Sequence, residues 1–214
     1  MKDVILGAVI ANRQQELEGI VHRLKDHLDW MQLDVMDGYF VPNTSLEFDF
    51  ELPDTGNRYE AQLMVRDPAT WIKRNADKFD SLLVHAECCR FPEPERILDL
   101  GRDLCKRVGV ALRPETPLEV IMPLIPRVDE VLIMTVEPGA YGGAFLSEPL
   151  QKVAELRRIR NDLDIEVDGG IDDNTIKLAK DAGANLFVSG SYLLKSEDVG
   201  KSVSRLKDGI DLNY

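Results

Sequence analysis

The feature that most constrains the fold is a series of short runs rich in Val, Ile and Leu, which recur along the chain at a steady interval. Each run has the length of a buried strand. Eight runs can be marked, at residues 4–10, 30–36, 60–65, 81–87, 108–112, 131–136, 164–168 and 185–189. They are spaced roughly 20 to 30 residues apart, which leaves room for the crossover helix that joins two parallel strands.

Helical patterns fill most of the intervals between these runs. Apolar residues follow the first run at the spacing of one helix face. Asp67 is followed by Pro68, and Ser147 by Pro149, so each pair combines a residue that caps helices with a proline suited to the first turn. We therefore expect helices to begin at both places.

Eight strand-then-helix units, with no linker or low-complexity segment between them, predict a single-domain (β/α)8 barrel of the α/β class over residues 1–214. The alternative is a doubly wound open sheet, which usually has fewer strands and a glycine-rich first turn; the chain contains no GxGxxG motif. Residues 44–58 contain Pro53 and Gly56 and show little helical periodicity. The second helix is therefore expected to be short, irregular or missing.

The charge balance limits the partners of such a domain. Lys and Arg number 26 against 38 Asp and Glu, which gives a net charge of −12. This field repels phosphate backbones, so no nucleic-acid partner is expected, and a phosphate site would have to use backbone amides. No apolar run reaches the roughly 18 residues of a membrane span, and the start of the chain lacks an export signal. Its three cysteines form no CxxC pair, so we expect reduced thiols and a cytoplasmic protein.

In a barrel of this kind the active site lies at the carboxyl ends of the strands, and alternate strand residues point inward. Several positions that share the inward face carry polar or sulfur side chains: Gln32, Asp34, Met36, Gln62, Met64, Glu166 and Asp168. Asp34 and Asp168 belong to strands that are not neighbours, so they could face each other across the mouth. Two carboxylates on opposite sides of a bound carbon suit a two-base proton transfer. Alternatively, each carboxylate accepts hydrogen bonds and only sets loop geometry.

Glycines cluster where the last three strands end, at Gly139, Gly142, Gly143, Gly169, Gly170 and Gly190, the last followed by Ser191. The loops after the seventh and eighth strands of such barrels commonly bind phosphate through exposed backbone amides. The alternative is that these glycines only permit tight turns. Two glycine-containing loops on adjacent strands favour a phosphate site.

Six strings carry a resemblance to a known family: LDVMDGYFVPN (33–43), QLMV (62–65), HAE (85–87), MTVEPG (134–139), VDGG (167–170) and SGS (189–191). In order and in position on the strands, they resemble the ribulose-phosphate 3-epimerase family. The resemblance implies a (β/α)8 barrel that interconverts D-ribulose 5-phosphate and D-xylulose 5-phosphate with two aspartates and a divalent metal, which is Zn, Fe, Mn or Co. Asp34 and Asp168 match the two aspartates. Met36, Met64 and Met134 match methionines that pack around the reacting carbon.

The chain differs from the family in the side chains at the metal-binding positions. The family holds its metal with two histidines and the two aspartates, and the matching positions here are Gln32, Asp34, Gln62 and Asp168. Divalent metals of this kind prefer imidazole to a neutral amide, so no metal cofactor is expected. His85 matches a family histidine, for which a packed, hydrogen-bonded role is favoured over ligation.

Two further positions differ around the mouth. Ala8 stands where the family has a serine, and Tyr141, Gly142 and Gly143 stand where its sixth loop has a glycine and a glutamine. These changes keep the glycines of the loop but alter the side chains that a substrate would meet.

Three functions are weighed on these residues. The first is a sugar-phosphate epimerase, metal-independent or altered in substrate, in which the amides of Gln32 and Gln62 stabilise an enediolate. The second is a non-catalytic sugar-phosphate-binding or interaction protein on the same scaffold. The third, a barrel aldolase or decarboxylase, is disfavoured because no lysine accompanies the Asp34 carboxylate. The expected partner is a small sugar phosphate, and a homo-oligomer is left open. The expected substrate contacts are Gln32, Gln62, Met36, Met64, Met134, Gly142, Gly143, Gly169, Gly170, Gly190 and Ser191.

Overall fold

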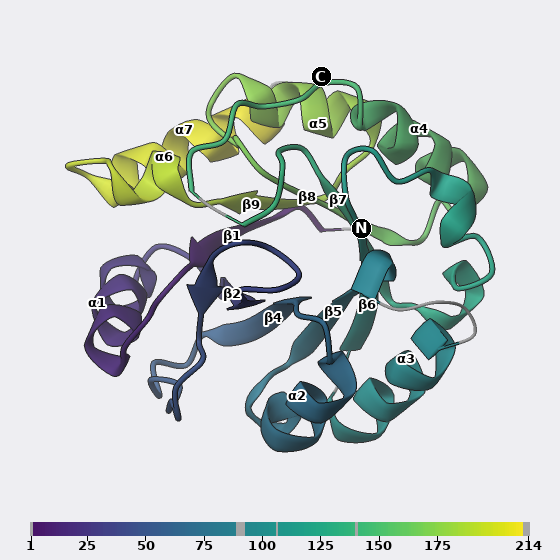
Figure 1. The fold of residues 1–214 in the computed structure, drawn as a ribbon. Helices are drawn as coiled ribbons and strands as arrows, with labels where there is room; N and C mark the ends of the chain where they lie inside the picture. The colour runs from purple at the N-terminus through teal and green to yellow at the C-terminus, as the bar shows by residue number, and fades with distance from the viewer. Residues whose placement is uncertain (1, 89–92, 106, 140, 212–214) are drawn as a thin grey trace.

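Eight parallel strands close into a barrel in the computed structural model, which describes residues 2–88, 93–105, 107–139 and 141–211 (Figure 1). The strands are β1 (Val4–Val9), β2 (Trp30–Asp37), β4 (Arg58–Met64), β5 (Ser81–His85), β6 (Arg107–Leu112), β7 (Glu130–Met134), β8 (Asp164–Asp168) and β9 (Leu186–Ser189). Each pairs in parallel with the next barrel strand, and β1 also pairs with β9, with Val4 opposite Leu186. That pairing closes the sheet, so the predicted single-domain (β/α)8 barrel is confirmed and the open-sheet alternative is wrong.

Helices surround the barrel (Figure 1). They are α1 (Gln14–Leu24), α2 (Pro68–Asn75), α3 (Glu93–Leu104), α4 (Leu150–Ile159), α5 (Thr175–Ala182), α6 (Ser191–Leu194) and α7 (Val199–Asp211). Between β6 and β7 the structure has two 3-10 turns, Leu118–Val120 and Ile125–Arg127, in place of an α-helix. Four prolines fall within residues 113–127, and each lacks the N–H that a continuous helix needs.

The flank between β2 and β4 has no helix in residues 44–58, all of which the structure describes. A two-residue strand, β3 (Thr44–Ser45), pairs antiparallel with the end of β2. Phe50 is 1% exposed, and its ring centroid lies 6.1 Å from that of Phe48 and 6.2 Å from that of Phe79. The second helix was predicted to be short, irregular or missing, and it is missing. Packing of aromatic side chains covers this side of the barrel in its place.

The two predicted helix caps have different outcomes. Asp67 caps α2 as predicted, because its Oδ1 accepts a hydrogen bond from the Thr70 N–H at 3.0 Å. The predicted side-chain cap of α4 is wrong: Pro149 takes the N-cap position, and no side chain among the described residues caps it. Instead, the backbone carbonyl of Ser147 accepts the Leu150 N–H at 3.1 Å, so a main-chain turn satisfies this helix start.

The strands separate two environments. Leu33 and Val35 of β2 belong to the main apolar core between strands and helices, whereas the alternate residues face the barrel axis. The axis is polar over much of its length, and its residues exposed by 1% or less include Gln32, Glu60, Gln62, Glu130 and Glu166. Within the described part of the chain, no helix has the length and apolar character that crossing a membrane requires.

Candidate active site

Asp34 and Asp168 lie toward the carboxyl ends of β2 and β8, two strands that do not pair with each other. Both carboxylates reach the side-chain amide of Gln62 on β4. With the orientation of the Gln62 amide assigned from its hydrogen-bond partners, its N–H2 group lies 2.7 Å from Asp34 Oδ1, 3.2 Å from Asp168 Oδ2 and 3.3 Å from Gln32 Oε1, while its oxygen accepts from His85. The structure thus brings the two aspartates singled out from the sequence to one amide at the barrel mouth.

Burial dominates the electrostatics of this pair. It raises the pKa of Asp34 well above its usual range, and the charge of Asp168 raises that pKa further. Burial also raises the pKa of Asp168 to about 7. Near neutral pH the pair therefore retains a proton that separate, exposed carboxyls would have lost, which is the state in which one group can act as acid and the other as base.

This raised pKa predicts how stability depends on pH. A carboxyl whose folded pKa exceeds its unfolded value stabilises the fold at low pH, and this stabilisation is lost as the pH rises through the folded pKa, here about 7. From pH 5.5 to pH 8, we expect the free energy of unfolding to fall by about 2 kcal/mol more in the wild type than in Asp168→Asn. Urea unfolding at the two pH values measures this difference. Equal decreases in both proteins would show that the carboxyl is not perturbed.

The mouth above the pair is lined by most of the expected substrate contacts, namely Met64, Met134, Gly142, Gly143, Gly169, Gly170, Gly190 and Ser191. Gln32, Gln62 and Met36 are not part of this lining, and Met36 instead packs with Met64 and Val41. Gly169 and Gly170 have φ angles of +121° and +65°, which favour glycine. The glycine-containing loops converge on the mouth, as a phosphate site requires. The positive φ angles are, however, enough by themselves to explain why residues 169 and 170 are glycine.

Tyr141 closes the mouth toward β1. Its hydroxyl donates to the Ala8 carbonyl at 3.0 Å and accepts the Ile10 N–H at 2.7 Å. The cavity left beneath it measures about 40 Å³. Small-molecule sites are commonly about 300 Å³ or larger, so this cavity is by itself too small to enclose a sugar phosphate.

The residues at the family's metal positions do not fit a metal ion. The Gln62 N–H2 group stands between the two carboxylates, and the Gln32 Nε2 donates to Glu166 Oε1 at 2.6 Å and to Glu60 Oε1 at 3.1 Å. Amide nitrogens donate hydrogen bonds and do not ligate metals, which leaves two aspartates where catalytic zinc normally has three protein ligands. Of the two amides expected to stabilise an enediolate, only that of Gln62 directs its N–H groups at the aspartates.

A second group of carboxylates lies lower on the barrel axis. Glu60, Glu130 and Glu166 present oxygens within 4.8 Å of one another, and this group could hold a metal ion. The pKa of Glu60 is raised by burial and by the charge of Glu130. The pKa of Glu166 is raised by burial and by the charges of Glu60 and Glu130. Of these three, only Glu166 was predicted from the sequence to face inward; Glu60 and Glu130 were not, although Glu60 shares the inward face of Gln62.

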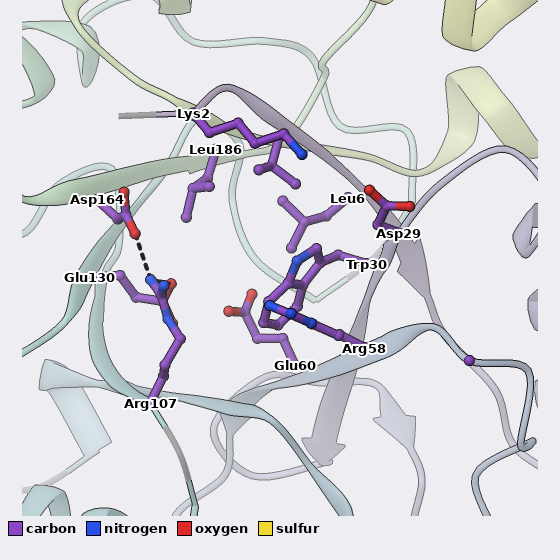
Figure 2. A pocket seen from close by; sticks show the side chains of 12 residues that line it. Lys2, Leu6, Asp29, Trp30, Arg58, Glu60, Arg107, Glu130, Asp164 and Leu186 are labelled. Atoms are coloured by element: carbon purple, nitrogen blue, oxygen red, sulfur yellow. Dashed lines mark hydrogen bonds and ion pairs between the residues drawn. The ribbon is translucent and has the colours of Figure 1, made fainter.

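The base of the barrel is hollowed beside this carboxylate group. The cavity has a volume of about 390 Å³. In Figure 2 the Glu60 carboxylate points into it, and Arg107 lies beside Glu130 and Asp164. An Arg107 guanidinium nitrogen donates to Glu130 Oε2 at 2.9 Å and to Asp164 Oδ2 at 2.7 Å. Arg107 therefore compensates part of the negative charge buried here, an interaction that the sequence analysis did not foresee.

Comparisons with known proteins agree with the sequence resemblance. The model described as the ribulose-phosphate 3 epimerase family matches residues 3–194. The chain is 36% identical to the ribulose-phosphate 3-epimerase of Schizosaccharomyces pombe, over 96% of this chain and 91% of that one. It is likewise 36% identical to the ribulose-phosphate 3-epimerase of Bacillus subtilis, over 95% of both chains.

A solved structure supports the fold alone. The 3-keto-L-gulonate-6-phosphate decarboxylase of Vibrio cholerae superposes with a TM-score of 0.75 and 11% sequence identity, covering 100% of both chains. At this identity the match extends to the barrel architecture and not to the chemistry.

Proposed function

This chain belongs to the ribulose-phosphate 3-epimerase family, and from that premise we propose that it epimerises D-ribulose 5-phosphate and D-xylulose 5-phosphate by proton transfer between Asp34 and Asp168. The observation that carries the proposal is the pair itself: the buried Asp34 carboxyl and the half-buried Asp168 carboxyl meet at the barrel mouth and are joined through one amide. The family and the fold support an isomerase of pentose-phosphate metabolism. The finer statement, a two-aspartate mechanism without a metal cofactor, is our proposal.

In the proposed reaction one carboxylate removes the proton from the carbon next to the ketone. The electron pair left behind forms an enediolate with the carbonyl oxygen. The other carboxyl, which holds a proton, delivers it to the opposite face of the same carbon and inverts that centre. The Gln62 N–H2 group lies between the aspartates, and when substrate is bound one of its two N–H groups can leave an aspartate and donate to the enediolate oxygen as charge develops.

Exchange of the substrate proton with solvent tests this chemistry. Purified protein, treated with a chelator, is incubated with D-ribulose 5-phosphate in deuterated water. Nuclear magnetic resonance then follows loss of the C3 proton and appearance of D-xylulose 5-phosphate. We expect both signals to change together, and the same result with untreated protein. Activity that disappears on chelation and returns with metal would contradict the metal-independent mechanism.

A second candidate function is sugar-phosphate binding without turnover. The observation that favours it is the set of side chains at the family's metal positions and at the mouth: the Gln62 and Gln32 amides are engaged in hydrogen bonds there, and the Tyr141 hydroxyl donates to the Ala8 carbonyl. A site without the family's metal ligands could still hold a sugar phosphate while lacking the group that stabilises an enediolate. Saturable binding of D-ribulose 5-phosphate, with no exchange of its C3 proton, would favour this function over the epimerase.

For either function, we propose that the sugar's phosphate binds backbone amides near Gly170 and Gly190. A side chain at Gly170 would meet Phe145 at 2.9 Å, and one at Gly190 would meet the Tyr141 ring at 2.8 Å. We expect Gly170→Val and Gly190→Val each to weaken the binding of D-ribulose 5-phosphate about 10- to 100-fold, because hydrogen bonds to a charged group contribute about 1.5–3 kcal/mol. Isothermal titration calorimetry measures the change.

Gly56→Ala is the matched control for these variants. Like Gly170, and unlike Gly190, Gly56 has a positive φ, +79°, but a Cβ added there would meet nothing within 4 Å and the residue lies away from the mouth. The control should therefore bear the same kind of backbone strain and bind normally. Unchanged affinity in both valine variants would rule out the amide site.

A further inference from the structure

His85 sits behind the Gln62 amide, on the side away from the aspartates. Its ring is fully buried at the end of β5, with Nε2 at 3.1 Å from Gln62 Oε1. Its other nitrogen, Nδ1, lies 3.3 Å from Glu87 Oε2. The Phe40 ring packs against the imidazole at a centroid distance of 5.0 Å. Both ring nitrogens therefore face acceptor oxygens, and the ring has no freedom to turn away.

Glu87 is itself held in place. Its second oxygen, Oε1, accepts the backbone N–H of Arg113 at 2.9 Å. Burial alone would raise the pKa of Glu87, but hydrogen bonding and electrostatic attraction to His85, with hydrogen bonds to Thr116 and the Arg113 N–H, together lower the pKa to about 2. The carboxylate is thus ionised at any working pH and offers His85 a fixed negative partner.

The orientation of Gln62 matters because an amide has two chemically different ends. With its N–H2 group toward the aspartates it donates to both. If the Gln62 amide rotated by half a turn, its oxygen would face the aspartates and could accept a hydrogen bond from whichever aspartate is protonated. The amide would then present no N–H donor to the substrate. A hydrogen-bond donor behind the amide oxygen prevents this turn in every protonation state of the pair.

We propose that His85 is a positioning residue: its Nε2–H holds the Gln62 amide with the N–H2 group toward Asp34 and Asp168, and Glu87 holds the His85 ring. The effect on turnover rests on the proposed epimerase function, whereas the orientation of the amide does not. In this arrangement both ring nitrogens of His85 donate, Nδ1–H to Glu87 and Nε2–H to Gln62, so the three side chains form one hydrogen-bonded row that ends on the two aspartates.

The first measurement is independent of activity. The side-chain N–H2 signals of Gln62, assigned by their loss in Gln62→Glu, are recorded by ¹⁵N nuclear magnetic resonance. In the wild type and in His85→Gln, which keeps a donor, we expect them to be shifted and protected from solvent exchange. In His85→Leu we expect both properties to be lost. Phe40→Leu, which removes the ring contact but no hydrogen bond of this row, should keep them.

The second measurement is turnover. A small misplacement of a group at the reacting atoms can cost about 10²-fold in rate. We expect His85→Leu to lower kcat by about this factor with KM changed much less, His85→Gln to recover most of the loss, and Glu87→Gln to lie between them. Should His85→Leu fail to fold, Glu87→Gln carries both measurements.

The outcomes separate the two proposals. Gln62 signals that change as expected in a protein without epimerase activity would support the positioning of the amide and contradict the proposed function. An active protein in which His85→Leu and Glu87→Gln leave the Gln62 signals and kcat unchanged would overturn the positioning role and leave the epimerase proposal standing. Loss of kcat with unchanged Gln62 signals would also overturn it, because His85 would then act by another route.

Discussion

Asp34→Asn and Asp168→Asn should each lower the rate of epimerisation by about 10²–10⁴-fold, the usual effect of losing a general acid or base. Asparagine keeps the size of the side chain but can neither remove nor deliver a proton. Because the two carboxyls act on opposite faces of one carbon, neither replaces the other. A coupled assay with D-ribulose 5-phosphate measures turnover in both directions.

The proton-exchange assay separates the roles of the two residues. Whichever carboxylate removes the proton in a given direction, its loss should abolish exchange in that direction. Asp29→Asn is the matched control, since Asp29 is exposed just before β2, at the opposite end from the mouth. Its rate should stay near that of the wild type. Substantial activity in both site variants would show that another base is used.

The second large effect is a gain of metal binding. The double variant Gln32→His and Gln62→His should bind one equivalent of Zn, Fe, Mn or Co with a dissociation constant of about 1 µM or lower, near −8 kcal/mol. Two imidazoles and two carboxylates make a four-ligand set for such a metal. Glu166 and Glu60, which now accept from Gln32, would accept from the new imidazole and orient it. Elemental analysis after dialysis and calorimetry measure the binding.

Two further variants locate the metal. Adding Asp168→Asn to the double variant should weaken binding, because it removes one of the four ligands, whereas adding Glu130→Gln should not, because Glu130 belongs to the lower carboxylate group. Wild-type protein that carries stoichiometric zinc or iron, lost in Asp34→Asn, would contradict our conclusion about the amides. Wild-type metal lost in Glu130→Gln would place it at the barrel base instead.

The strands could be predicted from sequence because buried parallel strands are nearly continuous apolar runs. The run at residues 164–168 matches β8 residue for residue, while those at 81–87 and 131–136 extend two residues past β5 and β7. Of the excess residues, Ala86, Thr135 and Val136 remain buried outside the strands, whereas Glu87 is half-buried, and residues 86–88 form a 3-10 turn. Hydrophobicity marks burial, so it cannot by itself mark where strand pairing stops.

The candidate site could be predicted only in part. Strand alternation assigned Asp34 and Asp168 to the inward face, but whether they meet depends on how the strands are staggered around the barrel. That stagger follows from pairings between strands, which a single sequence does not contain. The Gln62 bridge between the aspartates and the contact of Arg107 with Glu130 could therefore not be predicted from the sequence. The two-residue strand β3 was missed because so short a segment has no period.

The pairing of β1 with β9 sets the order in which the barrel can be completed. It joins Val4 to Leu186, so the first strand lacks one of its two neighbours until nearly the whole chain has been made. Translation at about 5–20 residues per second means that β1 waits on the order of ten seconds or more at the ribosome with one edge unpaired. Contacts so distant in sequence are also slow to form, because the intervening chain loses its entropy before they stabilise the fold. We therefore expect closure of the barrel to be a late event, and the nascent chain to depend on protection of its first strand during synthesis.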